Sequence, residues 1–484
     1  GKGMGVLSNL EPAEVFQYFE EICKIPHPSY KEKKLSDYCV AFAQAQDLEV
    51  HQDDLGNVII IKEATAGYET VEPLIIQGHL DMVCEKEPGC QLDFEKDGLC
   101  LSVEGDYITA QGTTLGGDDG IAVAMAMAIL ASDTLAHPRI EAVFTVSEEV
   151  GMEGAASIDL SPLKGHKVLN LDSEEEGFLL TSCAGGCRAN ITLPVSFETR
   201  QGILYDVSVS GLTGGHSGVE IDKGRANANL VMGRLLMTLE SAVDCSVVSL
   251  SGGLKDNAIP REAAATLLVA EQDADRMEAL IRETEKAIQC EYAVTEPALQ
   301  VGFVNKGADT AEALSAASRR KVITLLNLLP GGIQSMSANI KGLVETSLNL
   351  GILVLHGKEL EMHYAVRSSV QSAKEFLVDK LQNLTETLGG SLTTEGNYPA
   401  WEYRQDSVLR ETMVRVYREM YGKEPVIQAI HAGVECGLLA GKIEDMDAVS
   451  IGPDMVGIHT TEEKLSISST KRVWEYVTEV IRQK

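Results

Sequence analysis

Residues 113–131 read TTLGGDDGIAVAMAMAILA, two glycines and two aspartates followed by a strongly apolar run. An apolar run of this length is typical of a helix that is buried on all sides. Short runs rich in β-branched residues lie before and after it, at 58–61 (VIII), 74–76 (LII) and 142–146 (AVFTV). Strand, helix and strand in this order predict an α/β layer in which helices cover a sheet.

The pattern changes in the middle of the chain and then returns. Strand and helix patterns between 205 and 288 follow the order β-α-β-β-α, and a similar order from about 323 to 392 suggests a doubled unit. Predicted strands and helices alternate again in the C-terminal part of the chain. We therefore predict one α/β domain of residues 1–186 plus 397–484, interrupted by an inserted α+β domain of residues 187–396.

Composition and charge exclude several classes of protein. The 484 residues include 41 Lys and Arg against 72 Asp and Glu, a formal net charge of −31, which disfavours nucleic acid and anionic membranes as partners. No apolar run is long enough for a membrane helix, and residues 1–10 lack the apolar core of a signal peptide. Ten scattered cysteines without a CxxC pair favour reduced thiols. We therefore expect a cytoplasmic protein.

Five segments carry polar residues at predicted strand or loop ends of the α/β domain. They are GHLDM (78–82), TTLGGDDG (113–120), VSEEVG (146–151), LNLD (169–172) and SIGP with GIH (450–459). Each is a weak signal alone, since aspartates at a helix start are often only N-caps. Together they supply two histidines and several carboxylates, the ligand mixture that zinc accepts. The sequence therefore indicates a site for two metal ions that share a carboxylate.

These segments resemble the co-catalytic zinc exopeptidases, the family that includes carboxypeptidase G, peptidase T and the carnosinases. The resemblance is closest to the bacterial Xaa-His (aminoacyl-histidine) dipeptidases. It extends over nearly the whole chain through GLTGGHSGVEI (211–221), HAGVECG (431–437) and IGP with GIHTTEE (451–463). It implies a zinc-exopeptidase-like domain, with a mixed sheet between helices, and an inserted lid. It also implies hydrolysis of dipeptides such as β-alanyl-histidine by a metal-activated water.

The resemblance implies two Zn²⁺ ions per subunit, with Co²⁺ or Mn²⁺ as substitutes. The expected ligands are Asp118, shared by both ions, His79 and Asp172 on one ion, and Glu149 and His459 on the other. Asp81 would orient His79 through a hydrogen bond. The resemblance makes Glu148 the general base. Adjacent residues on extended backbone point to opposite sides, so one glutamate could bind metal while its neighbour faces a metal-bound water. A cis peptide bond between Asp118 and Asp119 is also implied.

Four further residues are candidates for contact with the substrate. His216 would stabilise the oxyanion, although a histidine in a glycine-rich turn can also lack any role. Asn257 would line the substrate site. Arg367 could bind the free carboxylate of a dipeptide or could be an ordinary surface arginine. Glu435 could bind the amino terminus of the substrate or could simply be an acidic residue at a helix start.

The dipeptidase hypothesis has two kinds of alternative. A tripeptidase or an aminoacylase of the same fold would share the metal site and differ in the lid. A non-catalytic metal-binding scaffold would be expected to lack the base or the shared ligand, yet both Glu148 and Asp118 are present. We expect a dipeptide substrate and a homodimer formed through the lid domain, with His216 acting in its own subunit or in the partner subunit.

Overall fold

The computed structural model describes residues 5–484. Residues 1–4, part of the stretch considered above for a signal peptide, lie outside the described residues. Within the described chain, no helix is both long enough and apolar enough to cross a membrane. Two compact units are present: the α/β unit, Gly1–Ser182, Tyr403–Ala429 and Val434–Lys484, and the inserted unit, Cys183–Glu402 and Ile430–Gly433.

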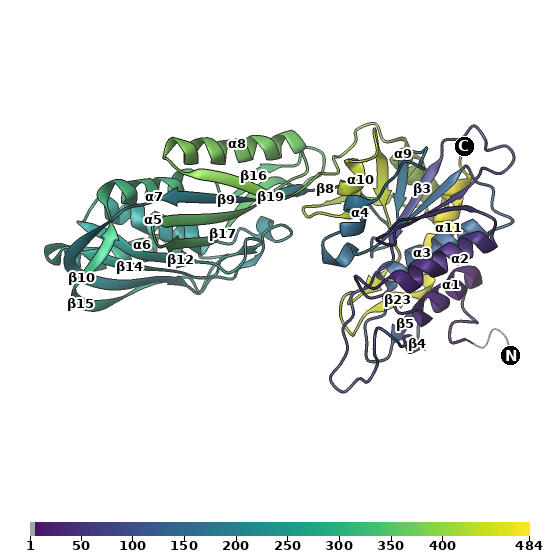
Figure 1. The fold of residues 1–484 in the computed structure, drawn as a ribbon, viewed down its shortest axis with the longest axis horizontal. Coiled ribbons are helices and arrows are strands. Elements are labelled where there is room, and N and C mark those ends of the chain that lie inside the picture. The colour runs from purple at the N-terminus through teal and green to yellow at the C-terminus, as the bar shows by residue number, and fades with distance from the viewer. Residues whose placement is uncertain (1–4) are drawn as a thin grey trace. The chain divides into compact units, whose positions relative to one another are not determined.

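The α/β unit is built on a mixed sheet with the strand order β1-β2-β6-β3-β7-β21-β8-β20; Figure 1 labels β3 and β8 of this sheet. In that order the strands are Glu49–Gln52, Val58–Lys62, Ile140–Thr145, Leu74–His79, Lys167–Asn170, Asp447–Ser450, Phe178–Cys183 and Val426–Ile430. Strand β3 pairs in parallel with β6 and β7, and β7 pairs in parallel with β21. The carboxyl ends of these four strands therefore meet at one edge of the sheet, where α/β folds place their sites.

Helices α2, α3 and α9 pack against this sheet, and α1 packs against α3; Figure 1 shows α1, α2 and α3 in the N-terminal part of the chain. The helices of the unit are α1 (Ala13–Lys24), α2 (Lys33–Ala45), α3 (Gly117–Ala131), α4 (Glu153–Ser157), α9 (Val408–Tyr421), α10 (Glu435–Ala440) and α11 (Ile467–Arg482). Every residue from Ile121 to Leu130 is buried, so the predicted buried helix is confirmed. A Cβ on Gly78 would lie 2.8 Å from Ala122 Cβ, so the glycine permits β3 and α3 to approach closely.

A small antiparallel sheet joins the segment after β21 to the segment before α3. Its strand order is β22-β23-β5-β4, that is Met455–Val456, Lys464–Ser466, Tyr107–Ala110 and Leu101–Glu104. Leu465 of β23 pairs with Ile108 of β5. Residues more than 340 positions apart are thereby brought to the same edge of the main sheet.

The inserted unit contains one long antiparallel sheet of order β15-β10-β14-β12-β17-β18-β9-β19, with β16 paired to β17. Its strands are β9 (Gly185–Pro194), β10 (Phe197–Ser210), β11 (Gly215–His216), β12 (Cys245–Gly252), β13 (Ala258–Ile259), β14 (Ala263–Val269), β15 (Gln300–Leu314), β16 (Gly332–Met336), β17 (Val344–His356), β18 (Glu359–Ser368) and β19 (Ser391–Tyr398). Its helices are α5 (Ala228–Glu240), α6 (Ala274–Glu291), α7 (Ala316–Leu328) and α8 (Gln371–Thr387).

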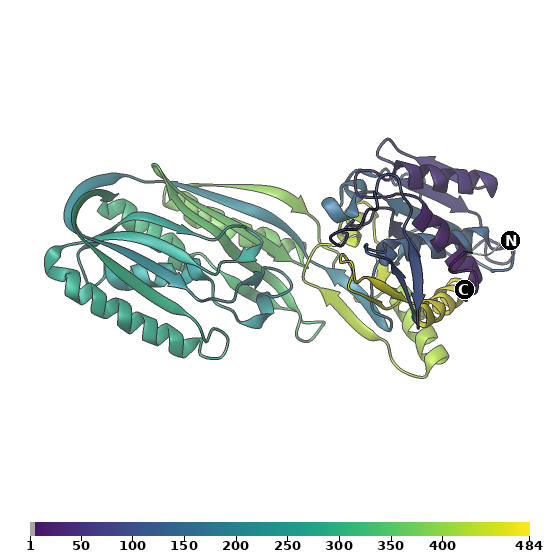
Figure 2. The same cartoon turned by 90° about the horizontal axis from the view of Figure 1, so that it is seen from below.

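The order strand, helix, two strands and helix occurs twice in the inserted unit. The first copy is β10-α5-β12-β14-α6 and the second is β15-α7-β17-β18-α8, apart from the short β11, β13 and β16. Along β10, the buried Tyr205, Val207 and Val209 alternate with the exposed Asp206 and Ser208. One face of the sheet is therefore covered by the helices, as Figure 2 also shows, which gives the α+β organisation that the sequence predicts.

Candidate metal centre

The four parallel strands deliver polar residues to one edge of the α/β sheet. His79 is the last residue of β3, and the pair 148–149 follows β6 in a 3-10 turn. Asp172 comes two residues after the end of β7, and His459 lies in the loop beyond β21. The parallel register of the strands is therefore what brings these distant segments together.

Asp118, in the first turn of α3, lies at the centre of these side chains. Its Oδ1 is 3.0 Å from His79 Nε2, and its Oδ2 is 2.9 Å from His459 Nε2. The His79 nitrogen is also 3.4 Å from Asp172 Oδ1, and the His459 nitrogen is 3.0 Å from Glu149 Oε2. Each oxygen of Asp118 therefore faces a different pair of one histidine and one carboxylate.

The donor atoms lie close enough to hold metal ions. Three groups have one donor atom per residue within 4.8 Å of one another: His79, Asp118 and Asp172; Asp118, Glu149 and His459; His79, Glu148 and Glu149. Among residues 5–484, the ion pairs of these carboxylates are with histidines and none is with Lys or Arg. Crowded carboxylates without balancing cations are unfavourable, so this ligand set fits divalent ions.

The peptide bond between Asp118 and Asp119 is cis, as the family resemblance implies. Asp119 is buried and its Oδ2 accepts a hydrogen bond from the backbone N–H of His79, at 3.2 Å. Helix α3 begins without a side-chain cap, and its N-cap is Gly116 with φ of +70°. Neither aspartate is therefore the N-cap that the alternative interpretation of this segment suggested.

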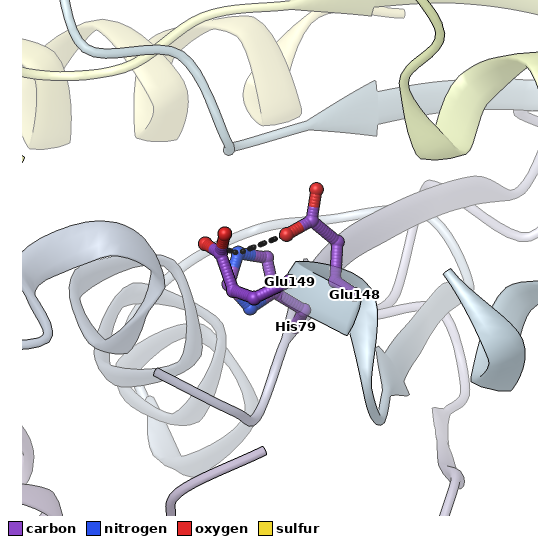
Figure 3. A group of neighbouring side chains, drawn as sticks. All are labelled: His79, Glu148 and Glu149. Atoms are coloured by element: carbon purple, nitrogen blue, oxygen red, sulfur yellow. Dashed lines mark ion pairs between the residues drawn. The ribbon is translucent and has the colours of Figure 1, made fainter. Parts of the chain in front are cut away.

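The two adjacent glutamates do not lie on extended backbone, so that expectation is wrong. Glu148 and Glu149 belong to a 3-10 turn, η1 (Glu148–Val150), that follows Ser147 with φ of +55°. Both carboxylates turn toward the same ring (Figure 3): Glu148 Oε2 is 3.5 Å and Glu149 Oε1 is 3.6 Å from His79 Nε2. The turn, and not strand alternation, sets the direction of the two side chains.

The buried carboxylate of Asp81 fixes this turn relative to the histidine. Its two oxygens accept hydrogen bonds from the backbone N–H groups of Glu148, at 3.0 Å, and Glu149, at 3.1 Å. His79 Nδ1 is 3.2 Å from the same carboxylate and 2.9 Å from the Asp81 backbone oxygen. Ser29 Oγ donates a further hydrogen bond at 2.6 Å. Asp81 therefore positions His79 and both glutamates at once.

The electrostatics of the cluster reflect its excess of negative charge. Burial raises the pKa of Glu148 to about 8, and the charges of Glu149 and Asp118 add to this effect. Burial alone would lower the pKa of His79, but Asp172 and Glu148 outweigh it and hold that pKa well above the ordinary value. The cluster therefore attracts positive charge.

Glu463 is a positioning residue that the sequence prediction missed. It is 3% exposed, and its Oε1 accepts hydrogen bonds from the backbone N–H groups of Leu115, at 2.8 Å, and Gly116, at 3.0 Å. Its Oε2 accepts one from the N–H of Asp118 at 3.3 Å. The sequence signal for this role is the motif GIHTTEE, in which Glu463 follows the candidate ligand His459 by four residues. One motif thus supplies a candidate ligand and a support for Asp118.

A buried polar network underlies the metal ligands. Glu435 is 1% exposed, and its carboxylate accepts hydrogen bonds from Thr145 Oγ1, at 2.7 Å, and Gln77 Nε2, at 2.9 Å. Asn170 Nδ2 donates to Gln77, and Asn170 Oδ1 accepts from the backbone N–H of Asp172 at 3.0 Å. Burial, followed by the charge of Glu148, raises the pKa of Glu435 to about 7. The network connects α10 to the backbone of a candidate ligand.

The remaining candidates, His216, Asn257 and Arg367, come together in the inserted unit. Strand β11 pairs with β13, and the Ser217 N–H donates to the Asn257 carbonyl at 2.9 Å. A Cβ on Gly218 would lie 3.0 Å from both His216 Cε1 and Arg367 Nε. The Gly218 N–H donates to His216 Nδ1 at 3.0 Å, so the neutral ring carries its proton on Nε2.

Comparisons with known proteins show which family and which relatives the chain resembles. The family model described as Peptidase family M20/M25/M40 matches residues 75–483. The cytosol non-specific dipeptidase of Escherichia coli (strain K12) is 38% identical, with 99% of each chain covered. The crystal structure of an aminoacylhistidine dipeptidase from Vibrio alginolyticus has a TM-score of 0.93 and 35% identity over 99% of each chain. For the aminopeptidase PepT from Bacillus cereus, a TM-score of 0.55 at 16% identity over 98% of each chain shows a common fold alone.

Replacing Glu463 should loosen the segment that carries Asp118. In Glu463→Ala, three backbone N–H groups lose their acceptor, so we expect the free energy of unfolding to fall by about 1–3 kcal/mol. Hydrogen exchange at residues 115–118 should become faster, while urea unfolding reports the loss of stability. The matched control is Glu462→Ala, at the exposed neighbouring position. Unchanged exchange at 115–118 in Glu463→Ala would contradict the positioning role.

Proposed function

The chain belongs to peptidase family M20/M25/M40, and we propose that it is a metallodipeptidase acting on Xaa-His and related short dipeptides. The observation that carries the proposal is that the two oxygens of Asp118 face two separate histidine–carboxylate pairs. The similarity of the whole chain to two dipeptidases supports dipeptides as the substrate class.

Two zinc ions are the proposed metals, with Co²⁺ or Mn²⁺ as substitutes for the same nitrogen and oxygen ligands. Asp118 would be shared, with His79 and Asp172 completing one set and Glu149 and His459 the other. When bound, such ions act as Lewis acids toward the scissile carbonyl and lower the pKa of a water molecule. The ligand sets contain histidine and carboxylate but no thiolate, a mixture that suits zinc and its common substitutes.

Glu148 is the proposed general base. No hydrogen bond engages its carboxylate in the described part of the chain, whereas Asp81 holds its backbone N–H. The side chain is therefore held at its backbone, while its carboxylate faces the His79 ring at 3.5 Å. It accepts a proton from the attacking water and returns that proton to the leaving amine. Asp81 acts through His79 and the glutamate turn, by holding them in place.

The roles of the other candidates remain predictions. His216, with its proton on Nε2, is suited to donate a hydrogen bond to a developing oxyanion, in its own subunit or in the partner subunit. Asn257 is proposed to line the substrate site and Arg367 to bind a carboxylate. Glu435 is 1% exposed and its carboxylate already accepts hydrogen bonds from Thr145 and Gln77, so it is proposed to support the strand ends and not to bind the amino terminus of the substrate. A homodimer formed through the lid and a cytoplasmic location are also proposed, the latter because the Escherichia coli relative is named a cytosol dipeptidase.

A substrate panel tests the proposed function. Chelator-treated protein should be inactive, and added zinc should restore hydrolysis of β-alanyl-histidine and Leu-His, because the ligand set needs its metals for catalysis. Leu-Gly-Gly and N-acetyl-leucine should be cleaved at least tenfold more slowly. Release of product amino acids is the measurement, and untreated protein is the control. Efficient deacetylation or tripeptide cleavage without dipeptide hydrolysis would contradict the proposal in favour of an aminoacylase or a tripeptidase.

The substitution Glu148→Gln should abolish most of the catalytic turnover while leaving metal binding intact. The amide keeps the shape of the side chain but cannot accept the proton, so we expect kcat on Leu-His to fall about 10²- to 10⁴-fold. Metal content per chain, measured by mass spectrometry, should remain that of the unmodified protein. Glu444→Gln, at an exposed position, is the matched control. Near-normal turnover in metal-loaded Glu148→Gln would refute the assignment of the base.

A further inference from the structure

Four consecutive backbone N–H groups lead into the turn that carries Glu148 and Glu149, and each of them donates to a side chain. The N–H groups of residues 146–149 donate in order to Asn57 Oδ1 at 2.9 Å, to Glu32 Oε2 at 2.6 Å, and to the two oxygens of Asp81 at 3.0 and 3.1 Å. The path of the backbone after β6 is therefore set by three side chains from other parts of the α/β unit.

Ser147 is the residue at which the chain leaves the direction of the strand. Its φ of +55° and ψ of +35° lie in the left-handed region, which residues with a side chain adopt only where their surroundings hold them. Ser147 is 5% exposed, and both its N–H and its hydroxyl donate to Glu32 Oε2, at 2.6 and 3.2 Å. Glu32 is therefore the contact that favours the left-handed conformation of Ser147.

The side chain of Glu32 does not serve the helix to which the residue belongs. Glu32 is the N-cap of α2, a position whose side chain usually accepts a hydrogen bond from the first turn of its helix. No such bond is formed, and the residue, which is 4% exposed, contacts Ser147 instead. A buried carboxylate is unfavourable unless it accepts hydrogen bonds. The position of this carboxylate therefore points to a role in the turn.

The residues just before Glu32 contact the same region. Ser29 Oγ donates to Asp81 Oδ2 at 2.6 Å, and the Tyr30 hydroxyl donates to the Val150 carbonyl at 3.5 Å. One short segment, 29–32, thus reaches the turn before Glu148 and after Glu149, and also contacts the carboxylate that holds the turn between these points. All of these residues belong to the α/β unit.

We propose that Glu32 is a positioning residue, which holds Ser147 in its left-handed conformation and thereby directs Glu148 and Glu149 toward the His79 ring. Without this acceptor the buried Ser147 N–H would lack a partner, and the backbone would leave the left-handed region to find one. A shift of about 1 Å in a catalytic group lowers a rate by up to about 100-fold. The kinetic part of this inference rests on the proposed dipeptidase function, whereas the effect on the turn can be measured without it.

Two substitutions of similar size separate the hydrogen-bond acceptor from the volume of the side chain. Glu32→Met keeps an unbranched side chain but has no oxygen, so kcat of the zinc-loaded protein on Leu-His should fall about 10- to 100-fold, while KM changes less than about threefold. Glu32→Gln keeps an oxygen for the Ser147 N–H, so its kcat should remain within about threefold of the unmodified protein. Steady-state kinetics at saturating zinc provides both constants.

Hydrogen exchange measures the state of the turn independently of activity. In Glu32→Met the N–H groups of residues 147–149 should exchange about tenfold faster or more, because the first of them loses its acceptor. Exchange in Glu32→Gln should stay close to that of the unmodified protein. Glu32→Asp keeps the charge but is one methylene group shorter and should behave like Glu32→Met. It therefore decides the outcome if Glu32→Met does not fold.

Cys39→Ala is the control for a general loosening of α2. Cys39 lies on the buried face of the same helix, so its truncation should lower the resistance to urea. Exchange at residues 147–149 and kcat should nevertheless stay unchanged. Circular dichroism spectra that match the unmodified protein establish that each variant is folded.

The outcomes distinguish this inference from the proposed function. If the unmodified protein hydrolyses no dipeptide, the proposed function fails, and exchange at residues 147–149 alone decides whether Glu32 holds the turn. If Leu-His is hydrolysed but folded Glu32→Met keeps its kcat, the positioning role is contradicted while the dipeptidase function stands. Equal losses in Glu32→Met and Glu32→Gln, or in Glu32→Met and Cys39→Ala, would contradict it as well. Loss in Glu32→Met with retention in Glu32→Gln supports the role.

Discussion

Four carboxylates gathered around two histidine nitrogens at one edge of a sheet are the constraint on which the rest of this structure depends. Asp118, Glu148, Glu149 and Asp172 repel one another, and burial increases the repulsion because water no longer screens it. Such a cluster persists only if the surrounding structure holds it and if cations offset its charge. The α/β unit meets the first condition, and the proposed metal ions would meet the second.

The support for the cluster comes from hydrogen bonds to its backbone as much as from packing. Asp81 holds the turn of Glu148 and Glu149, and Glu463 holds the segment that ends in Asp118. Asn170 holds the backbone of Asp172. Each support is a polar side chain that accepts from a main-chain N–H, so the candidate ligands keep their positions while their own oxygen and nitrogen atoms stay available to a metal ion.

Much of the fold and of the candidate site could be predicted from local signals. An apolar run such as 121–130 predicts a buried helix. Polar residues directly after apolar strands, such as His79 and Asp172, indicate a site at the strand ends. The α/β class with an inserted α+β part and the peptidase family are confirmed. The roles of individual site residues are still predictions, although the structure brings the candidate ligands together.

What the sequence missed depends on distant partners. The 3-10 turn at Glu148 cannot be predicted from its neighbours, because the carboxylates that accept from its backbone belong to Asp81 and Glu32, which lie 67 and 115 positions away.

The sharing of Asp118 by two metal ions is the central claim, and anomalous X-ray diffraction from zinc-loaded crystals tests it most directly. The account predicts two zinc peaks about 3.5–4 Å apart, one beside each Asp118 oxygen. A single peak, or peaks that do not contact Asp118, would contradict it.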